Sequence, residues 1–194
     1  MENSFTAKLN GLTKSKQNRS LNGLLKVFEN KSFAVLFMLL MAIPALPLPT
    51  GGVTHIFELI VMLLALEMIA GRSTIWLPKR FSRAKLPDKF WTKTLPVLVR
   101  LINKFERFSR PRLSGLLSAP LAQRLVGIIV LGFAICAFLA PPFSWLDTLP
   151  SLGIVIISLA LIFEDTLALI AGLIIGSIGI GLVIFIGEAV FQLL

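Results

Sequence analysis

Hydrophobic residues form long runs along the chain, separated by short stretches rich in proline, glycine or charge. The runs cover residues 33–48, 53–70, 125–139, 151–163 and 166–194. Runs of this length with almost no charge are typical of helices that lie in a lipid bilayer. The pattern predicts an all-α integral membrane protein whose last run is long enough to cross the membrane.

Proline-rich breaks join the first four runs into two hairpins. Residues 44–52 interrupt the first pair of runs, and residues 141–150 interrupt the second. Proline removes a helix donor and keeps the preceding residue out of the helical conformation, so each pair is broken rather than kinked. The helices expected at 32–43 and 151–163 are short against about 30 Å of hydrocarbon, which favours half-membrane helices. Two interpretations fit: hairpins of full spans, or re-entrant pairs that turn inside the bilayer.

The two hairpins follow one plan of helix, proline-rich break, second helix and polar stop. A shift of 95 residues lays Pro47 on Pro142 and Ala65 on Ala160. We therefore predict an internal repeat that relates residues 32–72 to the start of a segment covering 125–194. Repeated discontinuous helices that meet near the membrane midplane are typical of transport sites.

A polar segment, residues 1–31, precedes the first hairpin, and a polar connector, residues 73–124, separates the two. Within the connector, residues 94–109 predict an amphipathic helix with an apolar stripe on one side and basic residues on the other. The stripe holds Trp91, Leu95, Leu98, Ile102 and Phe105, and the basic side holds Lys89, Lys93, Arg100, Lys104 and Arg107. This helix either lies on an anionic membrane surface or packs on the protein's own helices.

Composition and charge give the orientation. The chain is 56% hydrophobic and carries a net charge of +9, and all 19 basic residues fall at or before Arg124. By the positive-inside rule, the N-terminus and the connector lie in the cytoplasm, both hairpins enter from that side, and the partners there are anionic lipid headgroups. A soluble enzyme and a nucleic-acid-binding protein are both excluded by this composition.

Small residues recur on the last run at positions that form a packing face. Gly172, Gly176 and Gly181 share one region of the helix, and small residues at four-residue spacing let helix backbones approach closely. We expect this face to support a homo-oligomer or a complex with other membrane proteins.

Charged residues inside the apolar runs are the candidate substrate- or ion-binding residues, because a charge at bilayer depth usually faces a partner or a cavity. His55 and Glu58 are three residues apart beside the first break, and Asp147 lies in the second. Arg72 ends the second run, where it either anchors to headgroups or binds a lipid phosphate.

The remaining acids lie where the apolar runs end. Glu67, Glu164 and Asp165 are candidates of the same kind, with headgroup-level placement as the alternative. The sequence holds one histidine and one cysteine, so no metal site, cofactor site or catalytic signature is predicted. We expect a protein that is not an enzyme.

Several motifs resemble the ExoD family of bacterial exopolysaccharide-synthesis membrane proteins. They are, in order, Leu46-Pro47-Leu48-Pro49, Gly71-Arg72, Trp76-Leu77-Pro78, Arg110-Pro111-Arg112, Pro141-Pro142-Phe143, Leu149-Pro150 and Glu164-Asp165. The chain departs from the family pattern at Glu67, in place of a glutamine, and at Thr166, in place of a glycine. The resemblance implies a multi-pass bacterial inner-membrane protein associated with exopolysaccharide production.

Two functions remain open at this point. The chain either handles or transports a lipid-linked or anionic substrate, or it acts as a non-catalytic scaffold in a polysaccharide assembly complex. A transporter requires a polar cavity that reaches the membrane middle, whereas a scaffold requires an unpaired apolar or glycine-lined face.

Overall fold

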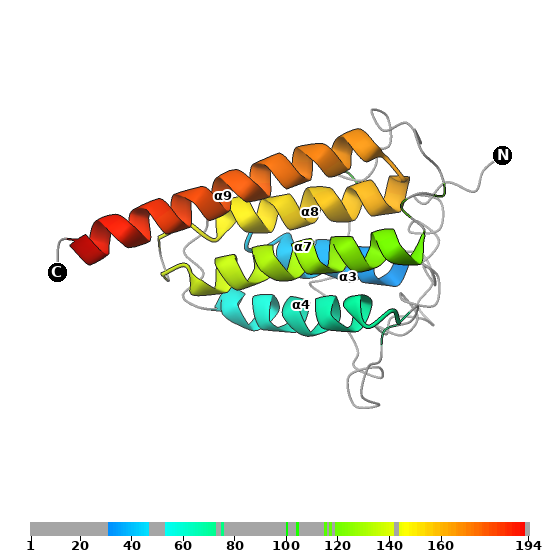
Figure 1. The fold of residues 1–194 in the computed structure, drawn as a ribbon, viewed down its shortest axis with the longest axis horizontal. Helices are drawn as coiled ribbons and strands as arrows, with labels where there is room; N and C mark the ends of the chain where they lie inside the picture. The colour runs from blue at the N-terminus through cyan, green and yellow to red at the C-terminus, as the bar shows by residue number, and fades with distance from the viewer. Residues whose placement is uncertain are drawn as a thin grey trace.

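The fold is a bundle of helices. The computed structural model describes residues 31–46, 53–72, 75, 100, 104, 115, 117, 119–141 and 144–192. Its helices are α3 (Ser32–Met41), α4 (Val53–Ile69), α7 (Pro120–Leu139), α8 (Thr148–Phe163) and α9 (Thr166–Gln192) (Figure 1). The expected all-α class is confirmed for these ranges, which contain no strand. The segment 1–30 and the amphipathic helix expected at 94–109 lie outside the described residues, apart from Arg100 and Lys104, which are helical and exposed.

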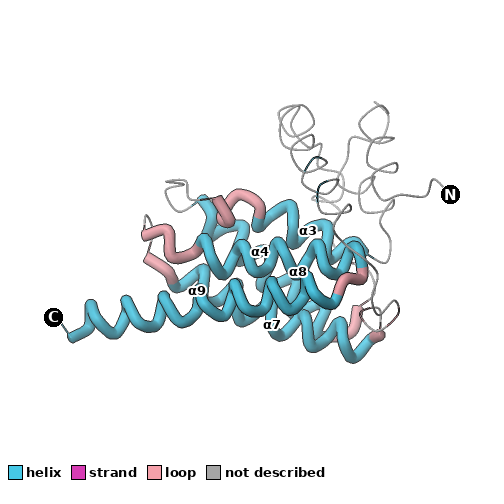
Figure 2. Tube along the Cα trace, turned by 90° about the horizontal axis from the view of Figure 1, so that it is seen from above, coloured by secondary structure: helices cyan, strands magenta, loops and turns pink. Residues whose placement is uncertain are grey.

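Four of the helices close into a ring. Helix α3 packs on α4 and α8, and α7 packs on the same two helices from the other side. Helix α9 lies outside the ring, mainly on α8, and also touches α7. Figure 2 shows α9 projecting beyond the other helices toward the C-terminus. In this ring α4 and α8 lie on opposite sides of the centre, as do α3 and α7.

Both helix breaks lie at the same end of the bundle. The α3–α4 and α7–α8 connections lie at the end toward which α9 projects, whereas the α8–α9 turn lies at the opposite end (Figure 1). Helices α3 and α7 therefore both run toward the break end, and α4 and α8 both run back from it.

The observed helix ends agree with the expected ones except at the starts of α7 and α8. Helix α7 begins at Pro120, five residues before the apolar run that starts at Leu125, so its first turn lies in the segment expected as connector. Helix α3 ends two residues before the expected Ile43, and α4 covers almost the whole second run. The expectation that the fourth helix begins at Ser151 is wrong, because α8 begins at Thr148 and has 16 residues. Pro150 is the third residue of α8, where the missing N–H would have no intrahelical acceptor. At 1.5 Å per residue α8 is about 24 Å long, longer than expected.

Large apolar side chains fill the ring. Residues from all four helices are completely buried there: Phe37, Met41, Val61, Val130, Ile154 and Ile157. Burial of this kind stabilises a bundle through close packing and exclusion of solvent from the apolar surface. The core therefore extends through the middle of the ring.

Glycines bring α8 and α9 into backbone contact. A Cβ on Gly153 would lie 2.7 Å from the Cα of Gly176 and 2.9 Å from the carbonyl oxygen of Gly172. A Cβ on Gly176 would also overlap the ring of Phe133 on α7. Gly172 and Gly176 thus serve a contact within the chain, and the expected partner complex stays a prediction. Gly181 has open space beside it.

Candidate functional site

Helix α4 ends in a left-handed turn that places Arg72 at one end of the bundle. Gly71 has a φ of +80°, a conformation that only glycine adopts without strain. The Gly71 N–H donates to the Met68 carbonyl at 3.0 Å, and the Arg72 N–H donates to the Glu67 carbonyl at 3.2 Å. This pair of bonds satisfies carbonyls left open at the helix end. Arg72 therefore follows the helix directly, at the end opposite the proline-rich breaks.

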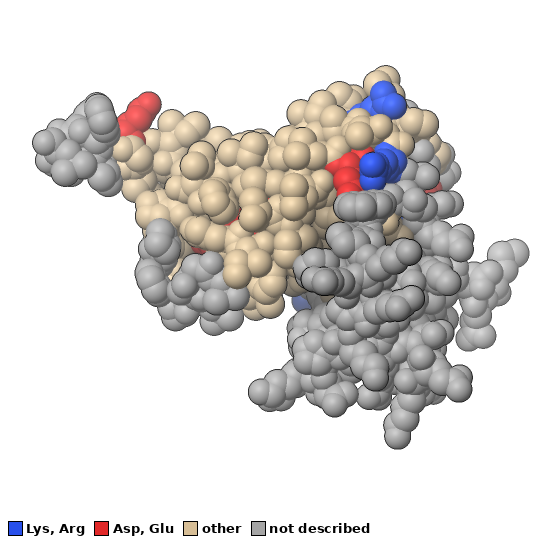
Figure 3. Space-filling model, turned by 90° about the horizontal axis from the view of Figure 1, so that it is seen from below, with Lys and Arg blue, Asp and Glu red and all other residues tan. Residues whose placement is uncertain are grey.

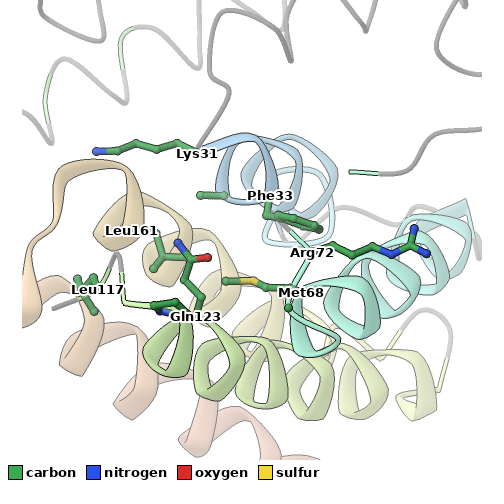
Figure 4. Close-up of a pocket in the computed structure, with 10 residues that line it drawn as sticks. Lys31, Phe33, Met68, Arg72, Leu117, Gln123 and Leu161 are labelled. Atoms are coloured by element: carbon green, nitrogen blue, oxygen red, sulfur yellow. The ribbon is translucent and has the colours of Figure 1, made fainter. Parts of the chain in front are cut away.

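A cavity of about 300 Å³ opens beside Arg72, between the ends of α3, α4, α7 and α8 (Figure 4). Its polar lining comes from Lys31, Arg72 and Gln123. Its apolar and glycine lining comes from Phe33, Ala34, Met68, Gly71, Leu117, Pro120 and Leu161. The volume is at the small end of the range for ligand pockets. A basic rim over apolar walls suits a ligand with an anionic head and an apolar body.

The two cations of this pocket are held differently. The Lys31 Nζ donates to the Ile162 carbonyl at 2.6 Å and lies 3.2 Å from Glu164 Oε1, so its charge is largely used within the chain. The Arg72 side chain is 52% exposed, and its Nη1 lies 4.0 Å from Glu67 Oε1, the outer limit of an ion pair. Arg72 consequently keeps donors for an external anion. In Figure 4 the two side chains extend to opposite sides of the cavity.

A second arginine lies against the same turn. A Cβ on Gly71 would lie 2.6 Å from Nη2 of Arg124, so the Arg124 guanidinium packs directly on this glycine. The left-handed backbone is what requires glycine at position 71, and a side chain there would also displace the Arg124 guanidinium. Arg72 and Arg124 therefore place two guanidinium groups beside the same turn.

Glu164 and Asp165 have local structural roles in the α8–α9 turn. Glu164 is in the left-handed region with a φ of 56°, and the Asp165 N–H donates to the Ala160 carbonyl at 3.0 Å. Asp165 Oδ1 accepts from the Leu167 N–H at 3.0 Å, which caps the start of α9. The Glu164 carboxylate is paired with Lys31. The geometry thus explains both acids as parts of the turn at the pocket end.

The other candidate residues meet at the opposite end of the bundle. Glu58 is fully buried, and its Oε2 lies 3.2 Å from Nδ1 of His55. Asp147, at the start of α8, lies close enough to interact with both of these residues electrostatically, and it accepts a hydrogen bond from the Thr54 side chain. Burial raises the pKa of the Asp147 carboxyl, and the neighbouring His55 and Thr54 oppose that shift.

The structure therefore divides the seven predicted site residues into two groups. Glu67, Arg72, Glu164 and Asp165 lie around the pocket end, and His55, Glu58 and Asp147 lie at the break end. Sequence reasoning missed Lys31 and Gln123, which join Arg72 only through the tertiary fold. In the described part of the chain, no group of three or more histidine, cysteine or acidic side chains is arranged to hold a metal ion.

Comparisons with known proteins give the family. A family described as "Exopolysaccharide synthesis, ExoD" matches residues 5–185. The chain is 30% identical over 141 residues to Protein ExoD of Rhizobium meliloti, covering 70% of this chain and 58% of that protein. It is 27% identical over 155 residues to an uncharacterized protein of Synechocystis sp., covering 80% of this chain and 72% of the relative. No solved structure matches the chain significantly. With nearly its whole length matched, the chain belongs to the ExoD family of exopolysaccharide-synthesis proteins.

Proposed function

We propose that the protein is a multi-pass protein of the bacterial inner membrane, with the pocket end on the cytoplasmic side. Helices α7 and α9 are long and apolar enough to cross a membrane. Large hydrophobic side chains are exposed along the helices, among them Leu59, Leu63, Ile128, Ile174 and Phe185. Exposed apolar surface on this scale favours a lipid environment.

The distribution of charge supports this orientation. Arg72, just after α4, and Arg124, in the first turns of α7, lie at the pocket end. The sequence that follows Arg72 is rich in further basic residues. Figure 3 shows charged side chains gathered toward one end, with a largely tan surface beyond them and an acidic residue near the far tip. Basic residues beside membrane ends are typical of the cytoplasmic side. The N-terminus accordingly lies in the cytoplasm in this proposal.

The substrate we propose is a lipid-linked anion, a saccharide carrier lipid bound through its phosphate. The single observation that carries this proposal is the 300 Å³ pocket in which exposed Arg72 stands over apolar walls. A guanidinium binds phosphate with two parallel hydrogen bonds, and the apolar lining accommodates the first units of a lipid chain. The association of the family with exopolysaccharide synthesis makes a lipid-linked precursor an appropriate ligand.

The depth of the pocket favours binding at headgroup level over passage through the membrane. Its lining residues lie at helix ends: Met68 near the end of α4 with Arg72 just after it, Pro120 and Gln123 at the start of α7, and Leu161 near the end of α8. His55 and Glu58, at the other end of α4, do not line it. We therefore propose a protein that captures or presents its substrate at the cytoplasmic surface, and that acts by binding rather than by catalysis.

The contacts between hairpins support the proposed internal repeat. If the repeat exchanges α3 with α7 and α4 with α8, the α3–α8 contact becomes the α7–α4 contact, and both contacts exist. The two hairpins run in the same direction, so the axis that relates them would be parallel to the helices. Gly172 and Gly176 do not support the alternative of a scaffold protein, because they pack against α7 and α8 of the same chain.

Native mass spectrometry of the purified full chain tests the proposed substrate. The probes are a polyprenyl phosphate and the matching neutral polyprenol, added to wild type, Arg72→Gln and Arg100→Gln. Arg100 is an exposed basic residue that does not line the pocket, so its variant controls for the loss of one charge.

We expect the wild type to retain the phosphate lipid in preference to the alcohol. Because a hydrogen bond to a charged group contributes about 1.5–3 kcal/mol, Arg72→Gln should weaken retention by roughly tenfold or more. Arg100→Gln should retain the lipid as the wild type does. Equal retention of the phosphate and the alcohol, or no effect of Arg72→Gln, would contradict the proposal.

A further inference from the structure

Glu58 occupies a core position of α4. The residues that α4 turns into the bundle recur at steps of four and three, and all are buried: Thr54, Glu58, Val61, Ala65 and Met68. Glu58 is the one acid in this series, and its side chain has no exposed surface. Because an ionised carboxylate is strongly disfavoured in an apolar interior, the position requires a compensating group.

The surrounding side chains only partly supply that compensation. His55 Nδ1 lies 3.2 Å from Glu58 Oε2, which is ion-pair distance, but the two atoms are not aligned for a hydrogen bond. Neither Glu58 oxygen has a hydrogen-bond partner among the described residues. From α8, Asp147 adds a second negative charge near Glu58.

A further buried polar group lies one helical turn beyond Asp147. Ser151 follows Asp147 by four residues and so lies on the same side of α8, one turn further along. Its side chain is fully buried, and its Oγ has no hydrogen-bond partner within the described ranges. A buried carboxylate on α4 and a buried hydroxyl one turn from Asp147, both without partners among the described residues, indicate polar groups that are completed by something else.

The neighbouring helices contribute little charge of their own. Helix α3, which packs on α4, has no titratable side chain, and α7 contributes Cys136, which is buried and free. Arg124 lies in the first turns of α7, at the other end of the bundle. With Glu58 and Asp147 ionised, the cluster is negative even when His55 is protonated. The cluster then carries one net negative charge, and binding one further proton or other monovalent cation makes it neutral.

We propose that Glu58, His55 and Asp147 form a proton-binding site in which the Glu58 carboxylate takes up the proton. The proton comes from water at the break end and forms an O–H bond on Glu58, which can then donate to a buried acceptor; on release it returns to water. His55 is 27% exposed and contacts Glu58, so it is placed to pass the proton between water and the buried carboxylate. A proton fits better than a metal ion, because the described side chains form no metal-ligand set.

Dicyclohexylcarbodiimide labelling of the full chain in lipid vesicles tests this site. The reagent enters apolar regions and reacts with protonated carboxyls, whose O–H adds across a C=N bond with no leaving group. Peptide mass spectrometry then locates the labelled residue as the pH is lowered. Glu67, with a 21% exposed side chain at the other end of α4, is the internal control in the same chain.

We expect Glu58 to be labelled more strongly than Glu67, with labelling that rises as pH falls and is lost from that peptide in Glu58→Gln. The wild-type measurement stands even if the variant does not fold. Absence of label at Glu58 at every pH, while Glu67 is labelled, would overturn the proposal. Protection of Glu58 by sodium chloride but not by choline chloride at constant pH would also overturn it, since the ligand would then be an alkali metal ion.

Discussion

The contact between α8 and α9 gives a sharp test of the fold, because it depends on a glycine that faces backbone. In Gly153→Ala, the new methyl group would lie 2.7 Å from the Cα of Gly176 and 2.9 Å from the Gly172 oxygen. Carbon atoms in favourable contact are about 3.5–4.0 Å apart, so the two helices must separate locally by about 1 Å. Backbone cannot rotate away as a flexible side chain can.

The expected loss of stability follows from two opposing effects. Overpacking of this kind costs about 1–3 kcal/mol, and the better helix propensity of alanine returns up to about 1 kcal/mol. We therefore expect Gly153→Ala to lower the free energy of unfolding by about 1–2 kcal/mol, which is roughly a tenfold change in the folded-to-unfolded ratio.

The assay is unfolding of the full chain in mixed micelles by increasing amounts of a denaturing detergent, followed by tryptophan fluorescence. Gly181→Ala is the matched control, since it changes the same residue type on α9 where a Cβ meets nothing within 4 Å. This variant should be as stable as wild type or slightly more so. If Gly153→Ala were as stable as Gly181→Ala, the close α8–α9 contact would be refuted, and the glycine face would again be available to a partner.

Three further outcomes are expected from the same titration. Asp165→Ala removes the cap on the Leu167 N–H and should cost about 1 kcal/mol, with Asp165→Asn retaining most of the stability. Gly71→Ala forces a side chain into a left-handed turn against Arg124 and should cost about 1–2 kcal/mol; a smaller loss would contradict the observed turn. Because burial raises the pKa of Asp147, the folded chain binds that proton more tightly than the unfolded chain. The stability this group supplies therefore falls as pH rises through its titration range, and Asp147→Asn should flatten this slope.

Most of the helical pattern could be predicted from the sequence because it depends on local chemistry. Proline and glycine in the first break end α3 and precede α4, and the structure has both helices close to the expected positions. The sequence pattern does not locate the start of α8, because Pro150 is equally typical of the break that precedes it. In the first turn of a helix a proline removes no hydrogen bond, so proline position alone does not locate a helix start.

The sites were less predictable, because each combines residues distant in sequence. Arg72 was a candidate from its place at the end of an apolar run, but Lys31 and Gln123 reach the same pocket only through packing of α3 and α7 on α4. The glycine spacing on α9 predicts that another helix packs closely there, but the spacing does not tell which helix it is. Gly153 and Phe133, which fill that face, come from other helices.

The two proposed sites lie at opposite ends of α4, and the core positions of α4 between them are apolar. From Glu58 to Met68, which lines the pocket, is ten residues, or about 15 Å of helix. Val61 and Ala65 occupy the intervening core positions with no exposed surface. The core face of α4 therefore provides no polar path between the sites, and a substrate held at the pocket would have no direct contact with the protonated carboxylate. We accordingly expect Glu58→Gln to retain polyprenyl phosphate as wild type does, and Arg72→Gln to keep carbodiimide labelling at Glu58. An effect of either substitution on the other site would contradict this independence. It would mean that α4 moves as a rigid body and couples proton binding at one end to lipid binding at the other.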